Sequence, residues 1–383
     1  KIYYFCAMRF LTADYLFPLY IAPIKQGVLQ ISDNKEVIAV FENRSEVPQE
    51  KLEVFEGILC PGFVNAHCHL ELSHLLGKAE KGKGFLDFIG AIQQRDSYTA
   101  IEKQIAINKA EQQMITNGIV AVGDICNTTD TLSQKQKSNL KYYNFIEVFG
   151  VKDDLIKQII SDAKYIRNQF RKVGQKATIS PHAPYSVPPK LMEEIKNSFS
   201  NEDELMTIHM QETKHENELF EHKRGSFYNW LKEINANPEV WNNRTKSNSV
   251  LEELENKKML LIHNTFAKKK NISDNYYCTC PKANLYIENA LPDYSIFDAD
   301  KLCVGTDSLA SNNSLSILEE LNIIQENSNF DLNNLLKIAC KNGAEALGFE
   351  QLGTFEKGKI PGVNVIGNLD GVKVTAESFI KVI

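Results

Sequence analysis

Several features that would mark other classes of protein are missing from this sequence. No uninterrupted apolar run is long enough to cross a membrane, and Arg9, Asp14 and Pro18 interrupt the first apolar stretches before the core of a signal peptide forms. The chain also has no surplus of basic residues, since its formal net charge is -6. Without a basic stripe it cannot neutralise the phosphates of a nucleic acid. We therefore expect neither a membrane nor a nucleic-acid partner.

The chain contains 8 cysteines, and their spacing is not that of a disulfide framework. No Cys-x-x-Cys motif is present. Scattered cysteines without such spacing are typical of reduced, buried thiols, so we expect a cytoplasmic protein. Cys278 and Cys280 could form a soft metal-binding pair. Because they fall in a strand-like run, structural burial is the favoured interpretation.

The two ends of the chain differ from its middle. With 383 residues, of which 43% are hydrophobic and 24% charged, the chain is long enough for one large domain with a small companion. Short apolar runs between polar turns predict strands at both ends; they cover residues 2–5, 27–31, 37–41, 363–366, 372–375 and 379–383. We expect these strands to form one small β-sandwich domain from residues 1–59 and 353–383.

The middle of the chain alternates between helical and strand patterns. Residues 103–117 carry apolar side chains at helical spacing and end at Asn117-Gly118, a typical helix end. Continuous apolar runs, as expected of buried parallel strands, begin after Gly62 and recur at 119–124, 144–148, 177–180, 205–209, 258–263, 276–280 and 301–305. About eight strands alternating with helices predict an α/β fold, a (β/α)8 TIM barrel over residues 60–352.

The first residues that could bind a metal follow directly after the first of these predicted strands. Pro61-Gly62 leads into the strand at Phe63-Val64, and His67 and His69 follow. Residues i and i+2 of an extended segment point to the same face, so both imidazoles can converge on one point. Imidazole is the commonest neutral ligand for zinc and iron. The pair alone is a weak signal, because it also fits a surface or core pair of histidines.

Further polar residues stand at the ends of other predicted strands. In a barrel the carboxyl ends of the strands meet at one face, where function collects. These ends carry His182, His209 with Glu212 just beyond it, His263 and Asp307. Alone, a histidine at a strand end is more often structural, and Gly-Thr-Asp is a common helix start. Such residues at successive strand ends of one barrel are hard to explain by packing, so they predict one site.

Together these motifs resemble the metal-dependent amidohydrolase superfamily, in the branch that deaminates cytosine, guanine, S-adenosylhomocysteine and related rings. The matching runs are Pro61-Gly62-Phe63-Val64-Asn65-Ala66-His67-Cys68-His69, Ser180-Pro181-His182-Ala183-Pro184-Tyr185, His209-Met210-Gln211-Glu212-Thr213, Ile262-His263-Asn264 and Gly305-Thr306-Asp307-Ser308-Leu309-Ala310-Ser311. Residues 342–348 and 352–359 are similar to the closing segment of the family, so the resemblance covers nearly the whole chain.

The resemblance implies a metal site and a set of catalytic residues. One divalent ion, zinc or alternatively iron, would have four ligands, which are His67, His69, His209 and Asp307. Glu212 would be the proton shuttle, His263 and Asp307 would be partners of the attacking hydroxide, and His182 would face the substrate. Binuclear relatives bridge two metals with a carbamylated lysine. No lysine stands at such a strand end between residues 118 and 182, so a mononuclear site is favoured.

The substrate is harder to predict. Residues 69–73 and 84–89, with Arg95, resemble the aminofutalosine deaminases of menaquinone synthesis more than the cytosine or guanine enzymes. Glu71, Ser73 and Arg95 then join His182 as predicted substrate-binding residues. Two of them have a plainer interpretation, because Glu71 equally fits a helix cap and Ser73 a polar surface position. Ala283 replaces the serine that is usual in the family, which leaves the substrate contacts there open.

We predict an enzyme that hydrolyses C–N bonds other than peptide bonds. It would deaminate a purine-like ring, such as that of aminofutalosine or another adenine-containing nucleoside, and release ammonia. The other class of zinc deaminases is excluded, because the chain has no Pro-Cys-x-x-Cys motif. Two alternatives stay open: a hydrolase of the same fold that removes chloride or opens a cyclic amide, and a non-catalytic relative, although no key position is broken. We expect a small-molecule substrate and a homo-oligomer such as a dimer.

Overall fold

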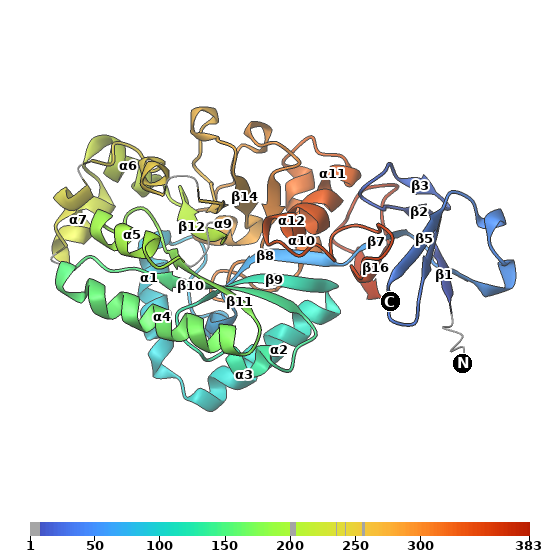
Figure 1. Ribbon diagram of the computed structural model, residues 1–383. Helices are drawn as coiled ribbons and strands as arrows, with labels where there is room; N and C mark the ends of the chain where they lie inside the picture. Colours follow the sequence, from blue (N-terminus) through green and yellow to red (C-terminus); the bar gives the residue numbers. More distant parts are fainter. Residues whose placement is uncertain (1–7, 200–203, 235, 242, 255–256) are drawn as a thin grey trace.

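The described part of the chain comprises a larger α/β region and two smaller sheets. The computed structural model describes residues 8–199, 204–234, 236–241, 243–254 and 257–383, so the strand predicted at residues 2–5 lies outside them. Figure 1 shows the two smaller sheets together at one end of the molecule, with the C-terminus beside them. Within these ranges, no helix is long and apolar enough to span a membrane.

Both ends of the chain contribute to the smaller sheets. The first sheet has the strand order β5-β4-β1-β6; its members are β1 (Arg9–Thr12), β4 (Val28–Ile31), β5 (Val37–Phe41) and β6 (Leu52–Val54). The second has the order β17-β16-β7-β2-β3 and consists of β2 (Tyr15–Leu16), β3 (Ile24–Lys25), β7 (Ile58–Pro61), β16 (Val363–Gly367) and β17 (Phe379–Val382). Pairing of β16 with β7 joins the end of the chain to the segment that enters the α/β region.

Apolar side chains give these two sheets a common core. Leu11 and Leu29 from the first sheet and Leu59 and Val365 from the second belong to one buried cluster. Because side chains alternate between the two faces of a strand, every second residue can reach this core. The strands predicted near residues 27–31, 37–41, 363–366 and 379–383 are therefore confirmed.

The strand predicted at residues 372–375 is wrong. Asp370 and Lys373 exchange two backbone hydrogen bonds, of 3.0 and 2.9 Å, across a turn in which Gly371 has a φ of 61°. Val374 is 2% exposed, whereas Val372 is 51% exposed. In a strand these two residues would share one face. The apolar residues of this stretch thus belong to a turn that is anchored by Val374 alone.

Eight parallel strands form the centre of the α/β region. They lie in two sheets with the orders β11-β10-β9-β8 and β12-β13-β14-β15. The strands are β8 (Phe63–Cys68), β9 (Ile119–Cys126), β10 (Lys141–Val148), β11 (Lys176–Pro181), β12 (Met206–Met210), β13 (Met259–His263), β14 (Tyr276–Thr279) and β15 (Leu302–Val304). Each coincides with a strand that the sequence predicted from an apolar run.

The edges of the two parallel sheets meet on both sides. On one side, the backbone N–H of His209 in β12 donates to the carbonyl of His182, just after β11, at 2.8 Å. On the other side, Cys68 in β8 forms a parallel bridge with Asp307, which follows β15. The N–H of Asp307 also donates to the carbonyl of His67 at 3.1 Å. These contacts hold the carboxyl ends of the first and last parallel strands together.

Two cores flank the parallel strands. Successive residues such as Phe145 and Ile146 in β10 belong to different buried clusters. Both clusters draw on strands of the two parallel sheets, but the cluster of Ile146 also contains the buried apolar residues of two long helices that cover the outer side, so the cluster of Phe145 is the inner one. Burial on both faces is typical of parallel strands. Cys278 and Cys280 belong to the inner cluster, so their burial is confirmed.

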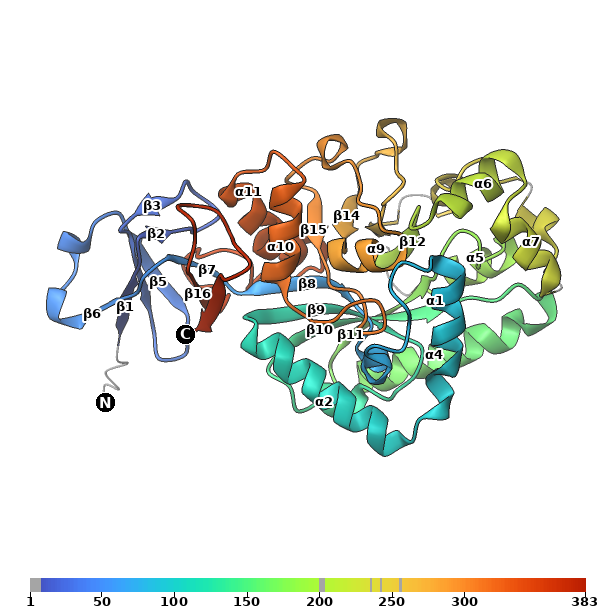
Figure 2. The ribbon, with the colours of Figure 1, turned by 180° about the vertical axis from the view of Figure 1, so that it is seen from behind.

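Helices connect the strands and cover their outer side, as Figures 1 and 2 show for α2 and α4. The α-helices are α1 (Phe85–Ile92), α2 (Ala100–Thr116), α3 (Leu132–Lys135), α4 (Ile156–Lys172), α5 (Pro189–Lys196), α6 (Lys214–His222), α7 (Ser226–Glu233), α8 (Ser249–Glu253), α9 (Pro281–Ile287), α10 (Ile317–Glu326), α11 (Leu332–Leu336) and α12 (Asn342–Ala346). Short 3-10 helices are η1 (Arg44–Glu46), η2 (Gln49–Lys51), η3 (Leu70–Leu75), η4 (Gln93–Ser97), η5 (Asp153–Leu155), η6 (Pro238–Trp241), η7 (Lys269–Asn271) and η8 (Tyr294–Ile296); η9 (Lys337–Lys341) is π-helical.

Local sequence fixes both ends of α2. Thr99 and Glu102 form a reciprocal capping box at its start. The helix ends at Asn117, and Gly118 follows with a φ of 75°. A Cβ atom at Gly118 would lie 2.4 Å from the side chain of Asn364, so the close approach of β16 requires glycine there. Nδ2 of Asn364 donates to the carbonyl of Gly118 at 2.8 Å, which ties the smaller sheets to the α/β region.

Candidate metal centre and active site

The carboxyl ends of the parallel strands bring together the polar residues that the sequence predicted. His67 lies in β8 with His69 just beyond it, His209 lies in β12, His263 ends β13 and Asp307 follows β15. All five side chains are buried. They come from segments that are far apart in the sequence, and only the arrangement of the parallel strands makes them neighbours.

Asp307 lies at the centre of the metal-ligand set that the resemblance implied. Its Oδ1 is 3.5 Å from Nε2 of both His67 and His69. Nε2 of His69 is 3.4 Å from Nε2 of His209. Ligand atoms at bonds of about 2.0–2.2 Å from a tetrahedral zinc ion are about 3.3–3.6 Å apart. The separations within this set therefore fit a single bound cation.

Several buried nitrogens of the set have no hydrogen-bond partner. Among the described residues, neither ring nitrogen of His67 nor Nδ1 of His69 is hydrogen-bonded. A buried polar atom without a partner costs about 1–3 kcal/mol. Coordination to a cation would satisfy Nε2 of His67, which faces Asp307, since imidazole binds metals through a ring lone pair. The unpaired nitrogens are thus a second observation that fits a metal site.

The charge states of these groups also suit a divalent cation. Burial lowers the pKa of His69 to about 3, and it lowers the pKa of His209 well below its ordinary value. Burial alone would raise the pKa of Asp307, but its contacts with His67 and the neighbouring histidines lower it instead. Neutral imidazoles and an ionised carboxylate are the forms that bind metal. The residues present therefore fit zinc or iron.

The backbone before and after Asp307 sets its position. Asp307 has a φ of 57°, in a left-handed region that residues other than glycine seldom adopt. A Cβ atom at Gly305 would lie 2.7 Å from the carbonyl oxygen of His67, so only glycine lets the last strand approach the first this closely. Ser311 Oγ donates to Oδ2 of Asp307. This contact leaves Oδ1 to face the histidines.

Glu212 and His263 lie beside the ligand set. Oε1 of Glu212 is 3.5 Å from Nε2 of His263, and Nδ1 of His263 is 2.8 Å from Oδ1 of Asn284. Burial, followed by the charge of Asp307, raises the pKa of Glu212 well above its ordinary value. Burial lowers the pKa of His263 to about 4. The pair therefore combines a carboxyl group that holds its proton more tightly than usual with an imidazole that favours its neutral form.

His263 also occupies a strained backbone position. Its φ is 67°, and Asn264 after it has a φ of 54°. These angles turn the chain sharply at the end of β13 and bring the imidazole towards the ligand set. A ring nitrogen of His263 lies close enough to ligand atoms of His67 and His209 to share a cation with them. A further contact to the same ion is thus open to His263.

The similarity of this sequence to a known protein family extends far beyond the residues of this site. The model of the amidohydrolase family matches residues 58–378, which is most of the chain. The chain belongs to the amidohydrolase family.

Amidohydrolases of named activity align with most of this chain. An adenosine deaminase of Helicobacter pylori is 27% identical over 335 residues, 84% of this chain and 81% of that protein. An aminodeoxyfutalosine deaminase of Nitratiruptor sp. is 26% identical over 365 residues, 91% of this chain and 89% of that protein. The solved structure of Helicobacter pylori aminofutalosine deaminase in complex with methylthio-coformycin has a TM-score of 0.80 at 23% identity, covering 96% of this chain and 93% of that chain. The chain therefore shares its fold with that enzyme.

In this amidohydrolase, His182 lies next to His209. The centroids of the two rings are 4.9 Å apart. Nδ1 of His182 is 2.7 Å from Oγ of Ser186, and burial lowers the pKa of His182 to about 4. Unlike the metal-ligand histidines, His182 is only partly buried. Its free ring edge is thus available to a ligand.

Glu71 and Ser73 have partners within the protein. The carboxylate of Glu71 accepts from the backbone N–H of Asn127 at 3.0 Å, and from the N–H and hydroxyl of Thr128 at 3.1 and 3.0 Å. Oγ of Ser73 donates to the carbonyl of Leu70 at 2.7 Å. These contacts give both residues a structural role after β8 and β9. Their predicted contacts with substrate stay predictions.

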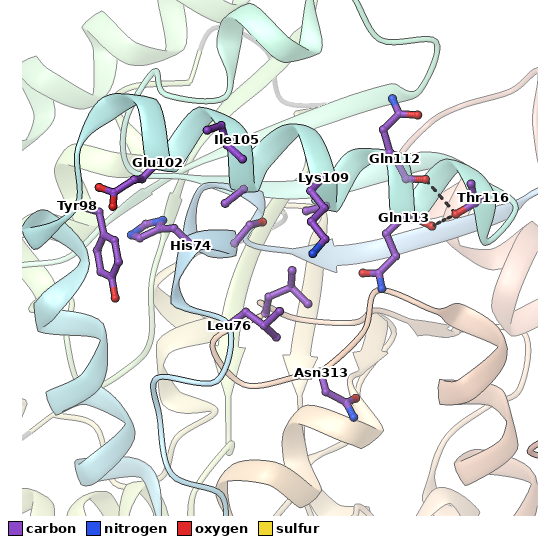
Figure 3. A pocket seen from close by; sticks show the side chains of 14 residues that line it. His74, Leu76, Tyr98, Glu102, Ile105, Lys109, Gln112, Gln113, Thr116 and Asn313 are labelled. Atoms are coloured by element: carbon purple, nitrogen blue, oxygen red, sulfur yellow. Dashed lines mark hydrogen bonds between the residues drawn. The ribbon is translucent and has the colours of Figure 1, made fainter.

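Ser73 also borders a groove on the outside of the α/β region. The groove has a volume of about 810 Å³ and lies between α2 and the segment after β8. Figure 3 shows His74, Tyr98 and Ile105 around it. None of the four metal-ligand residues lines this groove. Arg95 is close to it, since its carbonyl is 3.2 Å from Nε2 of His74.

The sequence analysis did not identify Glu147 as a site residue. Glu147 stands at the end of β10, where Tyr143 and Phe145 precede it at every second position and belong to the inner cluster. Burial raises the pKa of Glu147 to about 7, and the positive charge of Arg95 acts against this rise. Alternation along the predicted strand would have pointed Glu147 to the same face as Phe145. That pattern is the signal by which the residue could have been found.

Proposed function

We propose that this amidohydrolase is a metal-dependent deaminase of adenine-containing nucleosides, with aminofutalosine-like compounds among its candidate substrates. It would hydrolyse the bond between the ring and its exocyclic amine and release ammonia. The observation that carries the proposal is the position of the Glu212 carboxyl group, which is buried beside the metal-ligand set at 3.5 Å from Nε2 of His263 and has a raised pKa. The deaminases among the aligned relatives support the same reaction.

The proposed ligands of one divalent ion, zinc or alternatively iron, are His67, His69, His209 and Asp307. Histidine nitrogen and carboxylate oxygen are ligands that both metals accept. When bound, the ion supplies a water molecule with a lowered pKa at neutral pH. The remaining chemistry belongs to side chains of this protein.

Glu212 carries protons in this proposal. Because its pKa is raised, its carboxyl group holds a proton more readily than an ordinary carboxyl group, and it can protonate the ring nitrogen next to the carbon that bears the amine. It then receives the two protons of the attacking water in turn. The first passes to the departing amine, and the second returns Glu212 to its starting state. Water and the aminated ring thus yield a ring carbonyl and ammonia.

His263 and Asp307 orient the attacking water. The hydrogen bond between Nδ1 of His263 and Asn284 fixes the imidazole, so that its Nε2 faces Glu212. Ser311 fixes Asp307 in the same way, through Oδ2. Groups that are held by partners of their own lose little freedom when the reaction begins. His182 would face the substrate with the ring edge that is turned away from Ser186.

We also infer the architecture behind this site. The two parallel sheets would form a closed (β/α)8 TIM barrel over residues 60–352, with the site at its carboxyl end. The two smaller sheets would form a β-sandwich domain from residues 1–59 and 353–383, supported by the core that they share. A homo-oligomer such as a dimer and a cytoplasmic location stay predictions of the sequence.

Release of ammonia tests the proposed reaction. Purified protein would be offered adenosine, 5′-methylthioadenosine, aminofutalosine, free adenine, guanine and cytosine, with the metal content measured on the same sample. We expect ammonia from at least one adenine nucleoside and about one metal ion per chain. Release of chloride from a chlorinated ring, or opening of a cyclic amide, without any ammonia would favour the alternative hydrolase. No turnover of any compound by fully loaded protein would favour a non-catalytic relative.

A further inference from the structure

Glu147 carries a buried carboxylate oxygen that the reaction described above does not use. The side chain is more than nine-tenths buried at the carboxyl end of β10. Oε2 accepts from Nδ2 of Asn127 at 3.2 Å. Oε1 has no hydrogen-bond partner among the described residues. Because a buried acceptor without a partner is costly, its persistence points to a partner that arrives with a ligand.

The strand geometry directs this oxygen into the site. Tyr143 and Phe145 belong to the cluster between the two parallel sheets, and Glu147 follows them at the same spacing. Side chains at every second position share a face. Glu147 therefore extends the inner face of β10 to the carboxyl end of the strands, where His182 and His209 lie within reach of it.

A chain of hydrogen bonds holds Glu147 in this orientation. The backbone N–H of Asn127 donates to Glu71 at 3.0 Å, which fixes Asn127 after β9. Nδ2 of Asn127 then donates both to the carbonyl and to Oε2 of Glu147, each at 3.2 Å. With one oxygen fixed, the other cannot turn away from the site. Oε1 is thus a positioned acceptor.

Oε1 of Glu147 lies on the Nδ1 side of the His209 ring, opposite the nitrogen that faces the metal-ligand set. It lies 3.5 Å from Nδ1 of His209, whereas Nε2 of His209 faces His69 and the metal-ligand set. The two nitrogens lie on different edges of the imidazole ring. Glu147 is therefore separated from the metal-ligand set by the ring of His209. A group bound at Oε1 would therefore lie beside His182 and Nδ1 of His209, and not between Nε2 of His209 and His69.

We propose that Oε1 of Glu147 accepts a hydrogen bond from a sugar hydroxyl of the nucleoside and thereby selects hydroxylated nucleosides over their deoxygenated forms. The inference rests on the proposed deaminase function. A carboxyl oxygen without a partner can accept a hydrogen bond, and the sugar hydroxyls are the donors of an adenine nucleoside that lie away from the ring amine. A site built to bond a substrate hydroxyl rejects an analogue without it, because the buried acceptor then stays unpaired.

A second cation is the competing explanation. Glu147, His182 and His209 offer ligand atoms that lie close together. However, Nδ1 of His209 is 2.9 Å from the carbonyl of His182, to which it donates, so this nitrogen has no lone pair to offer. Nδ1 of His182 contacts Ser186, so this ring could offer only its Nε2. The geometry thus favours a hydroxyl donor over a metal ion.

The test compares each nucleoside with its 2′,3′-dideoxy form. The better substrate of adenosine and 5′-methylthioadenosine is used, and kcat/KM is measured for wild type, Glu147→Gln and Glu147→Ala. We expect wild type to favour the hydroxylated form by about a hundredfold or more. Both variants should lower this preference at least about tenfold, mainly by losing activity on the hydroxylated form, while metal content stays unchanged. Glu111→Gln is the matched control, since Glu111 is a buried residue of α2 that accepts a hydrogen bond from the hydroxyl of Tyr142.

Two outcomes would overturn this inference alone. In the first, wild type is active and both Glu147 variants keep its preference for the hydroxylated form. An equal fall of their activity on both forms of the nucleoside counts as this outcome. The other is a second equivalent of metal that is lost with Glu147. If wild type releases no ammonia from either nucleoside or from aminofutalosine, the proposed function itself fails, and this inference falls with it.

Discussion

Nε2 of His69 and Nε2 of His209 face each other at 3.4 Å, although 140 residues separate them in the chain. Nδ1 of His209 donates to the carbonyl of His182 at 2.9 Å, so its Nε2 carries a lone pair. Nδ1 of His69 has no partner in the described part of the chain. A cation between the two Nε2 atoms would be coordinated by both rings, and Oδ1 of Asp307 stands close enough to be a further ligand.

Loss of His209 should release the metal. We expect wild type to retain about one zinc or iron per chain after gel filtration, and His209→Ala to lose most of it, because one ligand is removed from a set of four. Metal analysis of both proteins measures this. His74→Ala is the control, since His74 lies at the outer groove. Two fully occupied metal equivalents in wild type would contradict the mononuclear site.

A buried ion pair outside the site should make a large contribution to the free energy of unfolding. Lys135 in α3 and Asp124 in β9 form a salt bridge in which both side chains are fully buried. We expect Lys135→Ala to lower the free energy of unfolding by about 3–5 kcal/mol, because the charge of Asp124 then stays unpaired in the core. Urea unfolding followed by circular dichroism measures the loss.

The double variant Lys135→Met with Asp124→Leu separates the charge from the packing. Removing both charges should restore most of the stability that Lys135→Ala loses. Full recovery is not expected, because Asp124 also accepts from the backbone N–H of Leu70 at 2.8 Å. If the double variant is as unstable as the single one, an unpaired charge is not the cause.

Glu320 should make the protein less stable as the pH rises from about 4.5 to about 8. Burial raises the pKa of Glu320 from 4.5 to about 8, although it accepts from the N–H of Lys282 and from Asn312. Between these values the folded protein binds the proton more tightly than the unfolded chain. The free energy of unfolding therefore falls as pH rises through this window, by at most about 1.4 kcal/mol per pH unit from this group.

Glu320→Gln should flatten that dependence. Unfolding in urea is compared at pH 5, 6, 7 and 8 for the variant, for wild type and for the control Glu326→Gln. Glu326 lies in the same helix but is exposed. The slope of stability against pH should decrease only in Glu320→Gln. An equal slope in all three proteins would show that Glu320 is already ionised in the folded state.

The apolar runs of the sequence predicted the eight parallel strands because buried parallel strands need continuous apolar residues, and no other element of this length does. Residues 372–375 show where such patterns are insufficient. Val372 and Val374 alternate as in a strand, yet one is exposed and the other buried. Whether so short a stretch pairs with a neighbour depends on the partner that tertiary structure provides.

The candidate site could be predicted where a proposed metal ligand stands at the end of an apolar strand pattern, as His67 and His209 do. The geometry of other parts of the site depends on backbone conformations that no local sequence pattern predicts. The left-handed φ of Asp307 and the close approach of Gly305 to His67 become visible only when the first and last parallel strands meet. Glu71 was predicted to contact substrate because residues 69–73 resemble aminofutalosine deaminases. Its hydrogen bonds to the segment after β9 depend on a contact between neighbouring strands.

The variant Glu212→Gln tests the central claim most directly. The amide has nearly the same shape as the carboxyl, and all four proposed metal ligands remain, so the fold and the bound metal should be preserved. Activity should nevertheless fall at least about a hundredfold, which is the usual contribution of a positioned acid or base. Asp307→Asn is the comparison, because it should weaken metal binding and activity together.

The decisive measurement is ammonia release per bound metal ion for Glu212→Gln beside wild type, on the best nucleoside substrate. A plainer account makes Glu212 a carboxylate at the start of α6, whose loss would cost roughly 1 kcal/mol of stability and little rate. We predict full metal content with turnover reduced by about two orders of magnitude or more. Near-normal turnover with the metal in place would contradict the role of Glu212 and, with it, the proposed deamination.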